Sequence, residues 1–241
     1  MEPIDLYLGS DLGLWALKQT PPDCIKQVIT EDDEISSEAQ ARNINVVPGN
    51  PNNVNFEFAS SGLSVHYPKI LGQSLISRYS KIYNIHPGFL PWGRGFYPVF
   101  WAMWEETPAG ATIHEIVAKV DQGPIVDQIP VEYYPHDTGY TLFSRVRYAE
   151  KQLFSQYSMA IIECENLPTT PQPSGGTYHT KAEFFNIKSL ENWHSIKTLE
   201  LVKLIRCLSF PGYSGLEISL EGQKFSVSME ALPKNQNSQI G

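Results

Sequence analysis

The chain has 241 residues, of which 41% are hydrophobic and 12% aromatic, and its formal net charge is −8. This length predicts one large domain, or one domain with a small appendage. The acidic balance argues against a general surface for the phosphate backbone of nucleic acids, although local basic residues could bind one small anion. Because no run of about 18 apolar residues occurs, we expect no membrane-spanning segment.

Cysteine usage and the amino terminus indicate the compartment. Cys24, Cys164 and Cys207 are far apart and form no C-x-x-C pair, so we predict unpaired thiols in a reducing compartment. The first ten residues, MEPIDLYLGS, carry no basic segment followed by an apolar one, and therefore no evident secretory signal. These features together predict a soluble cytoplasmic protein.

Short apolar runs alternate with helical stretches through the first 86 residues. We predict strands at residues 4–9, 24–30, 44–47, 63–67 and 81–85. Helices are predicted at residues 12–19, where Asp11 would cap the first turn, at residues 32–43 and at residues 72–79. The alternation indicates βαβ units and an α/β fold with a doubly wound, mostly parallel sheet. In such sheets ligands bind beyond the carboxyl ends of the strands.

The second half of the chain changes character at residue 167. Before it we predict a strand at residues 111–120 and a long amphipathic helix that begins near Asp137 or Thr138. Residues 167–176, LPTTPQPSGG, form a connector, and the tail beyond it contains a helix at residues 198–210 and a β-hairpin around Glu221-Gly222. We therefore divide the chain into a main domain, residues 1–166, and a carboxyl-terminal extension, residues 167–241.

Three polar side chains stand near the ends of predicted strands. Asn84 and His86 are two residues apart and so share one face of a strand, which Pro87 ends. Asp121 follows the strand at residues 111–120, and it would join them if the two strands lie side by side. An amide can donate to an oxyanion, an imidazole can take a proton and a carboxylate can orient the imidazole, which suits attack of an amine on an acyl carbon. Taken singly, a His before Pro is often structural and Asp121-Gln-Gly-Pro is simply a turn.

Other kinds of site find little support in the sequence. The six histidines show no close ligand spacing and no cysteine partners, so we predict no metal centre, and His114 is expected to be a buried supporting residue. No G-x-S-x-G nucleophile elbow occurs. Residues 9–13, GSDLG, do not fit the dinucleotide pattern G-x-G-x-x-G, which argues against a nicotinamide cofactor.

An ordered set of motifs resembles the formyltransferase family that uses N10-formyltetrahydrofolate. The set comprises Asn84-Ile85-His86-Pro87, Leu90-Pro91, Arg94-Gly95, Gly110-Ala-Thr-Ile-His-Glu and Asp121-x-Gly123-Pro124-Ile125, within residues 60–165. The resemblance implies a Rossmann-like core, N10-formyltetrahydrofolate as co-substrate, no metal, and Asn84, His86 and Asp121 as the catalytic residues. Many relatives have Ser where this chain has Gly88.

The same resemblance implies a pocket for the pteridine ring. The expected cofactor-binding residues are those after the fourth strand and those around the aspartate, namely Pro68, Lys69, Ile70, Leu71, Ile76, Val120 and Gly123. For Ile76, packing between helix and sheet is an equally good interpretation.

The acceptor is indicated outside the catalytic motifs. The loop after the first strand lacks the Gly/Ser/Asn-rich phosphate loop of glycinamide ribonucleotide transformylases, and the tail is shorter and less basic than that of methionyl-tRNA formyltransferases. Residues 94–101, 176–179 and 204–211 resemble the nucleotide-sugar N-formyltransferases. This resemblance implies a homodimer that acts on a dTDP-amino-dideoxyhexose, such as dTDP-4-amino-4,6-dideoxyglucose, for a surface glycan such as lipopolysaccharide O-antigen. Another amine acceptor, or a non-catalytic folate- or nucleotide-binding module, remains an alternative.

Ten residues are candidates for binding that acceptor. Lys181 and Arg206 could donate to a diphosphate, and aromatic residues of the tail could stack on thymine. A solvated lysine and packing aromatics are the simpler interpretation of the same residues. The candidate substrate-binding residues are Gly9, Ser10, Arg94, Tyr97, Tyr178, His179, Lys181, Arg206, Phe210 and Tyr213.

Overall fold

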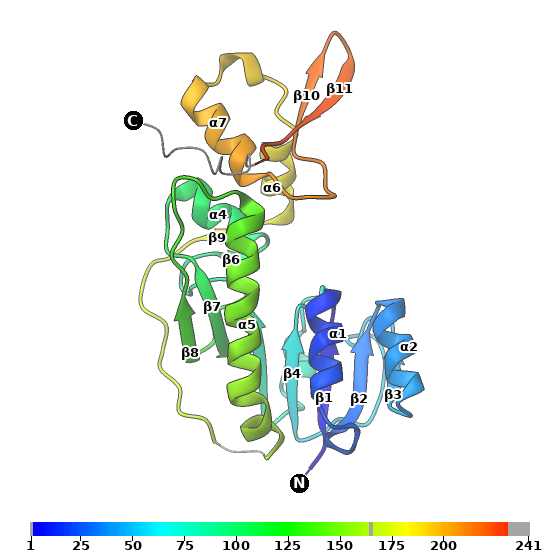
Figure 1. Ribbon diagram of the computed structural model, residues 1–241. Coiled ribbons are helices and arrows are strands. Elements are labelled where there is room, and N and C mark those ends of the chain that lie inside the picture. The colour runs from blue at the N-terminus through cyan, green and yellow to red at the C-terminus, as the bar shows by residue number, and fades with distance from the viewer. Residues whose placement is uncertain (1, 164–165, 231–241) are drawn as a thin grey trace, which may run out of the picture.

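A seven-stranded sheet forms the centre of the molecule in the computed structural model, which describes residues 2–163 and 166–230 (Figure 1). The strand order is β3-β2-β1-β4-β5-β7-β8. The first five are parallel to one another, whereas β7 and β8 run antiparallel to their neighbours. The strands are β1 (Ile4–Leu8), β2 (Ile25–Thr30), β3 (Asn45–Pro48), β4 (Ser61–Val65), β5 (Lys81–His86), β7 (Gly110–Glu115) and β8 (Ile125–Pro130). The predicted α/β fold with a mostly parallel sheet is confirmed.

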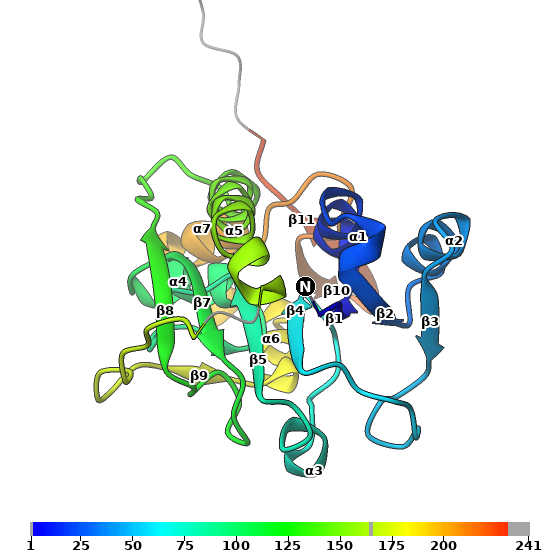
Figure 2. The ribbon, with the colours of Figure 1, turned by 90° about the horizontal axis from the view of Figure 1, so that it is seen from below.

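Helices cover both faces of this sheet (Figure 2). On one face lie α1 (Ser10–Gln19), α2 (Asp33–Ala41) and α5 (Gly139–Ile162), and on the other lies the short α3 (Gln73–Ile76). Leu6, Leu63 and Ile113 of the strands pack with the first group of helices in the main hydrophobic core. A smaller cluster around Tyr7 and Leu75 occupies the opposite face.

Local signals in the sequence explain where two of the helices begin. The Asp32 side chain accepts hydrogen bonds from the backbone N–H groups of Glu34 and Ile35, which caps α2. At the start of α5, Thr138 and Thr141 form a reciprocal capping box, as the predicted start near Thr138 requires. The cap predicted for α1 is wrong, because this helix begins at Ser10 after Gly9, and Asp11 instead pairs with Arg147 at 2.8 Å.

The segment after β5 differs most from the prediction. The strand predicted at residues 111–120 ends at Glu115, and residues 116–124 form a loop that leads into β8, a strand that the sequence pattern did not reveal. Helix α4 (Pro98–Glu105) was also missed, because every residue in it before Glu105 is apolar. Six of its eight residues are buried between α5 and the carboxyl-terminal helices, so no amphipathic stripe marks it.

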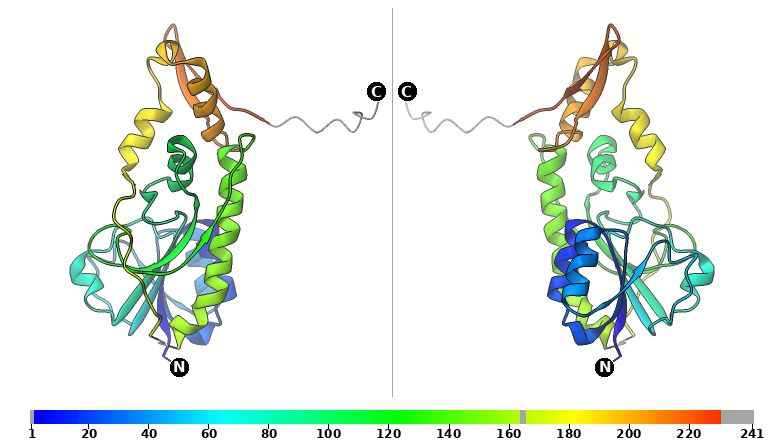
Figure 3. Two further views of the ribbon diagram at one scale, coloured as in Figure 1. Left: turned by 90° about the vertical axis from the view of Figure 1, so that its left-hand side faces the viewer. Right: turned by 90° about the vertical axis from the view of Figure 1, so that its right-hand side faces the viewer.

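The extension packs beyond one end of the sheet (Figure 3). It contains α6 (Lys181–Lys188), α7 (Thr198–Cys207) and the predicted hairpin, β10 (Leu216–Leu220) with β11 (Gln223–Val227). Both hairpin turn residues, Glu221 and Gly222, have positive φ, the combination that joins two strands tightly. Short 3₁₀ turns occur at Pro22–Cys24 and Trp193–Ser195.

Three predictions concern residues outside the described ranges, membrane spans and metal sites. Cys164 and the last two residues of the expected hairpin segment, 231 and 232, lie outside the described residues. Among the described helices, none combines the length and apolarity that a membrane span needs. The described ranges also contain no group of three His, Cys, Asp or Glu side chains arranged to hold a metal ion.

A buried polar network ties β1 to the neighbouring loop and helix. The fully buried carboxylate of Asp5 accepts hydrogen bonds from the Tyr79 hydroxyl at 2.7 Å, the Ala59 N–H at 3.1 Å and the Gln27 amide at 3.0 Å. Tyr79 in turn bonds the hydroxyl of Tyr7 at 2.8 Å. Burial raises the pKa of Asp5, and the three hydrogen bonds to its carboxylate oppose that shift.

Replacing Tyr79 with Phe tests how much this network contributes to the stability of the fold. The substitution keeps the ring but leaves a buried carboxylate oxygen and the Tyr7 hydroxyl each without one partner, so we expect a loss of about 1–3 kcal/mol in the free energy of unfolding. Chemical denaturation measures it. The matched control is Tyr148→Phe at an exposed site on α5, which should change stability by less than about 0.5 kcal/mol. Equal stability of the two variants would show that the network contributes nothing.

Candidate active site

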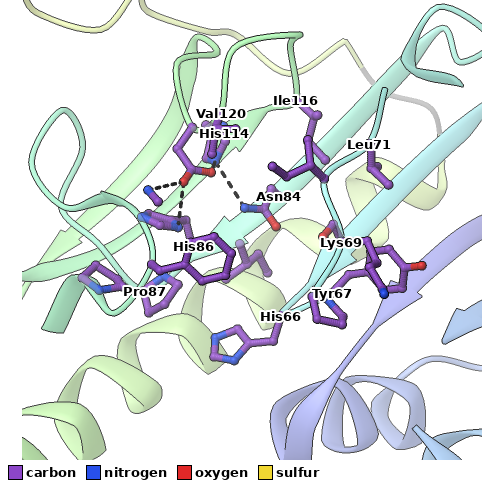
Figure 4. Close-up of a pocket in the computed structure, with 18 of the residues that line it drawn as sticks. His66, Tyr67, Lys69, Leu71, Asn84, His86, Pro87, His114, Ile116 and Val120 are labelled. Carbon is purple, nitrogen blue, oxygen red and sulfur yellow. Dashed lines mark hydrogen bonds and ion pairs between the residues drawn. The ribbon is translucent and has the colours of Figure 1, made fainter. Parts of the chain in front are cut away.

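A cavity of about 300 Å³ opens at the carboxyl ends of β4 and β5. Its walls come from three parts of the chain: residues 64–71 at and after the end of β4, residues 84–87 and 95–98 from β5 onward, and residues 114–121 at and after the end of β7. Figure 4 shows His86, His114 and Asn84 close together on one side of this cavity, with Tyr67 and Lys69 on the other. This is the edge of the sheet at which a parallel α/β fold binds ligands.

Strand register places two of the predicted catalytic residues here. Ser64 pairs with Asn84 and Val65 with Ile85, so the last residue of β5, His86, lies beside the residue that follows β4, His66. Asn84 and His86 point to the same face, as their two-residue spacing predicts, and both line the cavity.

The third residue, Asp121, arrives by a different route from the one expected. Because β7 runs antiparallel to β5, its carboxyl end at Glu115 lies beside Tyr83, near the start of β5. The loop after β7 therefore has to fold back across the face of the sheet. It places one carboxylate oxygen of Asp121 at 3.7 Å from Nδ1 of His86 and the other at 3.6 Å from Nε2 of His114. The structure thus brings Asn84, His86 and Asp121 together around one cavity.

A glycine permits the return of that loop. A Cβ atom on Gly123 would lie 1.7 Å from the carbonyl oxygen of Glu115, so the chain can pass there only without a side chain. Gly123 therefore shapes the loop and does not itself line the cavity.

His86 has a defined tautomer because one ring nitrogen is occupied. Its Nε2–H donates to the carbonyl oxygen of Gly93 at 2.9 Å, which leaves Nδ1 of the neutral ring as the free acceptor on the side of Asp121. A Cβ on Gly88 would lie 2.7 Å from that same Nε2. Glycine in place of the serine of many relatives therefore leaves room for the His86 ring in this arrangement.

His114 supports Asn84 and Asp121 as a neutral imidazole. Its Nδ1–H donates to the backbone oxygen of Glu115 at 2.8 Å, so the lone pair on Nε2 faces the Asn84 amide nitrogen at 3.4 Å. Burial lowers the pKa of His114 to about 4, an effect that outweighs the opposing attraction of Asp121. The neutral ring thus orients the Asn84 amide. The burial of His114 agrees with the sequence analysis, which did not anticipate its contacts with Asn84 and Asp121.

The depressed pKa of His114 has a consequence for stability. An unfolded chain protonates histidine near pH 6.5, whereas the folded chain does so only near pH 4, so stability should fall as the pH drops through this window, by up to roughly 3 kcal/mol. Urea unfolding at pH 7 and pH 4.5 measures the loss, and a His114→Gln variant should show a smaller one. His194→Gln at an exposed position is the control. The same pH dependence in His114→Gln as in the wild type would contradict the assignment.

The residues expected to bind the co-substrate divide into two groups. Pro68, Lys69, Ile70, Leu71 and Val120 line the cavity. Ile76 does not, because it packs from α3 against the smaller core cluster, in line with the alternative interpretation of this residue. The Lys69 ammonium group pairs with Glu31 at 3.2 Å, so the backbone and the side-chain stem of this lysine are what face the cavity.

The residues expected to bind the acceptor are more scattered. Tyr97 lines the cavity and stacks on Phe184 of α6, with ring centroids 3.7 Å apart. Ser10 lies at the start of α1, after Gly9, with its hydroxyl 3.2 Å from Nδ1 of His66. The guanidinium of Arg94 is held by Gln172.

The remaining candidates lie in the extension. His179 stacks on Trp101 and pairs with Glu105 at 2.9 Å, while Tyr178 and Lys181 are exposed on β9 (Tyr178–His179) and α6. Arg206 donates to three backbone carbonyls near the start of α5, and Phe210 packs on two rings of the same helix. Tyr213 is exposed. None of these six lines the cavity.

Several side chains of this region were not singled out from the sequence. His66 lines the cavity and contacts the fully buried carboxylate of Glu150 at 2.6 Å, although Glu150 comes from α5, far along the chain. Gln172 of the connector contacts both Arg94 and the backbone at Asp121. No local pattern marks these residues, because each partner comes from a distant segment.

Comparison with known proteins decides the family of the central segment. Residues 50–157 match the family described as formyl transferase. The matched segment is a formyl transferase domain. The resemblance predicted from the motifs at Asn84–Pro87 and Asp121–Ile125 is therefore confirmed, and both motifs lie inside the match.

Individual relatives are named as formyltransferases, one of them for a dTDP-amino sugar. The chain is 28% identical over 129 residues to a dTDP-4-amino-4,6-dideoxyglucose formyltransferase of Mycobacterium bovis, and the alignment spans 54% of each chain, about half of that relative's length. A 4-N formyltransferase from Francisella tularensis is similar in structure, with a TM-score of 0.82 at 21% identity, covering 96% of this chain and 98% of the other.

A third relative was solved with ligands. It is an N-formyltransferase of Helicobacter canadensis in complex with folinic acid and dTDP-3-aminofucose, with a TM-score of 0.74 at 18% identity, covering 93% of this chain and 86% of that one. At these identities the two structures show a shared fold that includes the extension as well as the formyl transferase domain.

Proposed function

We propose that this protein transfers a formyl group from N10-formyltetrahydrofolate to the amino group of a dTDP-amino-dideoxyhexose. The observation that carries the proposal is the convergence of Asn84, His86 and Asp121 on one cavity in a formyl transferase domain. The sugar that best fits the relatives is dTDP-4-amino-4,6-dideoxyglucose. The product would serve the synthesis of a surface glycan, such as lipopolysaccharide O-antigen.

In this proposal each of the three side chains has its own role. The Asn84 amide has two N–H groups, of which one faces His114, so the other can donate to the formyl oxygen as negative charge develops there. Nδ1 of His86 carries the free lone pair and can accept the proton that the attacking amine must lose. Asp121 lies opposite that nitrogen and stabilises the imidazolium once it forms.

The cavity wall fits a folate co-substrate. Ile70, Leu71, Ile116 and Val120 give it an apolar lining suited to a flat heteroaromatic ring. The backbone of residues 68–71 runs along the same wall and can offer the N–H and C=O groups that such a ring needs. When bound there, N10-formyltetrahydrofolate supplies the activated one-carbon unit beside Asn84 and His86.

The extension is the proposed source of acceptor specificity. Tyr97 and Phe184 join the rim of the cavity to α6 through a stacked pair, so a nucleotide sugar on this side could reach both the catalytic residues and the extension. We propose residues 1–166 as the catalytic domain and residues 167–241 as the unit that binds the nucleotide and forms a homodimer. Leu220 and Phe225, two exposed apolar side chains of the hairpin, support a partner surface there. The proposed compartment is the cytoplasm.

Substitution of the catalytic residues tests the proposal directly. His86→Ala and Asn84→Ala should each lower kcat by about 10²–10³-fold, because one loses the proton acceptor and the other an oxyanion donor. Tetrahydrofolate binding, measured by calorimetry, should change little. The matched control is His136→Ala, which removes an exposed imidazole away from the cavity. A near-normal kcat in His86→Ala would refute this mechanism.

Ligand binding separates the proposed acceptor from its alternatives. Calorimetry with dTDP, with UDP and with tetrahydrofolate should show binding of dTDP and tetrahydrofolate and much weaker binding of UDP. A formyl-transfer assay against dTDP-3-amino and dTDP-4-amino sugars then identifies the acceptor. Turnover with a UDP sugar, glycinamide ribonucleotide or methionyl-tRNA would assign a different acceptor. Binding without turnover of any amine would indicate a non-catalytic module.

A further inference from the structure

Residues 172–179, from the second half of the connector to the end of β9, cross the two loops that carry the site, and we refer to them as the strap. The strap ends in β9 (Tyr178–His179), which pairs in parallel with β6 (Arg94–Gly95). The backbone N–H of Arg94 donates to the oxygen of Thr177 at 3.1 Å, and that of Phe96 donates to the oxygen of His179 at 3.0 Å. The loop after β5 is therefore paired along its length with a segment more than eighty residues later.

Gln172 holds the loop that carries Asp121. Its amide nitrogen donates to the backbone oxygens of Asp121 and Gly123, both at 2.8 Å, and its amide oxygen accepts two hydrogen bonds from Arg94, at 3.2 and 2.8 Å. An amide offers two donors and two acceptor positions, so all four are in use and the orientation of the side chain is fixed. The backbone of Asp121 is thereby tied to Arg94 on the opposite loop.

Thr177 holds the segment that fixes His86. Its hydroxyl oxygen accepts a hydrogen bond from the N–H of Gly93 at 2.9 Å, and the carbonyl of the same glycine accepts the Nε2–H of His86. Two residues on, the N–H of Gly95 donates to the Asp121 carboxylate at 2.8 Å. One short loop thus sets both the tautomer of His86 and the position of the carboxylate opposite it.

We propose that the strap is a positioning device for catalysis, with Gln172 acting through Asp121 and Thr177 acting through Gly93 and His86. This inference rests on the formyl transfer proposed above. It assigns the connector to the catalytic machinery, although the predicted boundary at residue 167 places it in the extension. Strand β7 ends near the start of β5, away from the cavity, so the position of Asp121 depends on hydrogen bonds to the loop at residues 116–124. Gln172 donates two of these bonds.

Three substitutions test the strap. Gln172→Leu removes all four hydrogen bonds at similar volume, and Thr177→Val removes one hydroxyl without changing shape. Each should lower kcat about 10- to 100-fold, since a displacement of about 1 Å at reacting groups costs rates of that order. KM for both substrates and the Kd for tetrahydrofolate should stay within about threefold of wild type, because neither side chain lines the cavity. Thr177→Ser, which keeps the hydroxyl, should restore most of the activity.

The matched control lies in the same connector. Thr170→Val makes the same chemical change at an exposed residue whose hydrogen bonds to Ile125 run through the backbone, and it should leave kcat unchanged. Thermal unfolding of every variant confirms that the assay temperature lies below the transition. The proposal is overturned if folded Thr177→Val and Gln172→Leu turn over within about twofold of wild type, or if tetrahydrofolate binding weakens as much as kcat. Failure of the wild type to formylate any amine would instead sink the proposed function.

Discussion

The candidate active site depends on one short loop, residues 88–97, whose backbone fixes the positions of the His86 ring and the Asp121 carboxylate relative to each other. Gly93 accepts the Nε2–H of His86, and Gly95 donates its N–H to Asp121. Neither of these two glycines belongs to a strand of the seven-stranded sheet. The geometry of the proposed proton transfer is therefore stabilised by backbone groups of an irregular segment, and other parts of the chain must hold that segment in place. The Thr112 hydroxyl supplies part of that support, because it donates to the backbone oxygen of Gly88 and accepts from the N–H of Leu90. Backbone hydrogen bonds between the strap and residues 91–96 supply the rest.

Buried polar groups elsewhere follow the same pattern. Asp5, His114 and Glu150 are each almost fully buried, and each has a hydrogen-bonding partner from a distant part of the chain, namely Tyr79, Asn84 and His66. Burial without such partners would cost several kcal/mol per charged group. Two of the three, His114 and Glu150, lie next to the cavity or contact a residue that lines it. The fold thus retains costly polar groups where the proposed chemistry takes place.

Particular elements show which sequence signals were reliable. The parallel half of the sheet could be predicted because apolar runs alternate with capped helices, and the start of α5 because Thr138 and Thr141 form a local capping box. Helix α4 could not, since a helix buried all round has no polar face. The predicted Asp11 cap was wrong because α1 begins at Ser10 after Gly9, two residues before the start that the aspartate suggested.

The sequence by itself determined the fold class and the formyltransferase resemblance, and it singled out Asn84, His86 and Asp121 as the proposed catalytic residues. These depend on local spacing, and the signal survives because each residue belongs to a motif contiguous in the chain. Only the tertiary structure decided that β7 runs antiparallel to β5, so that a returning loop delivers Asp121, and that Gln172, Thr177 and His114 surround the site. Such contacts join residues tens of positions apart, and no periodicity along one chain encodes which distant side chains will meet.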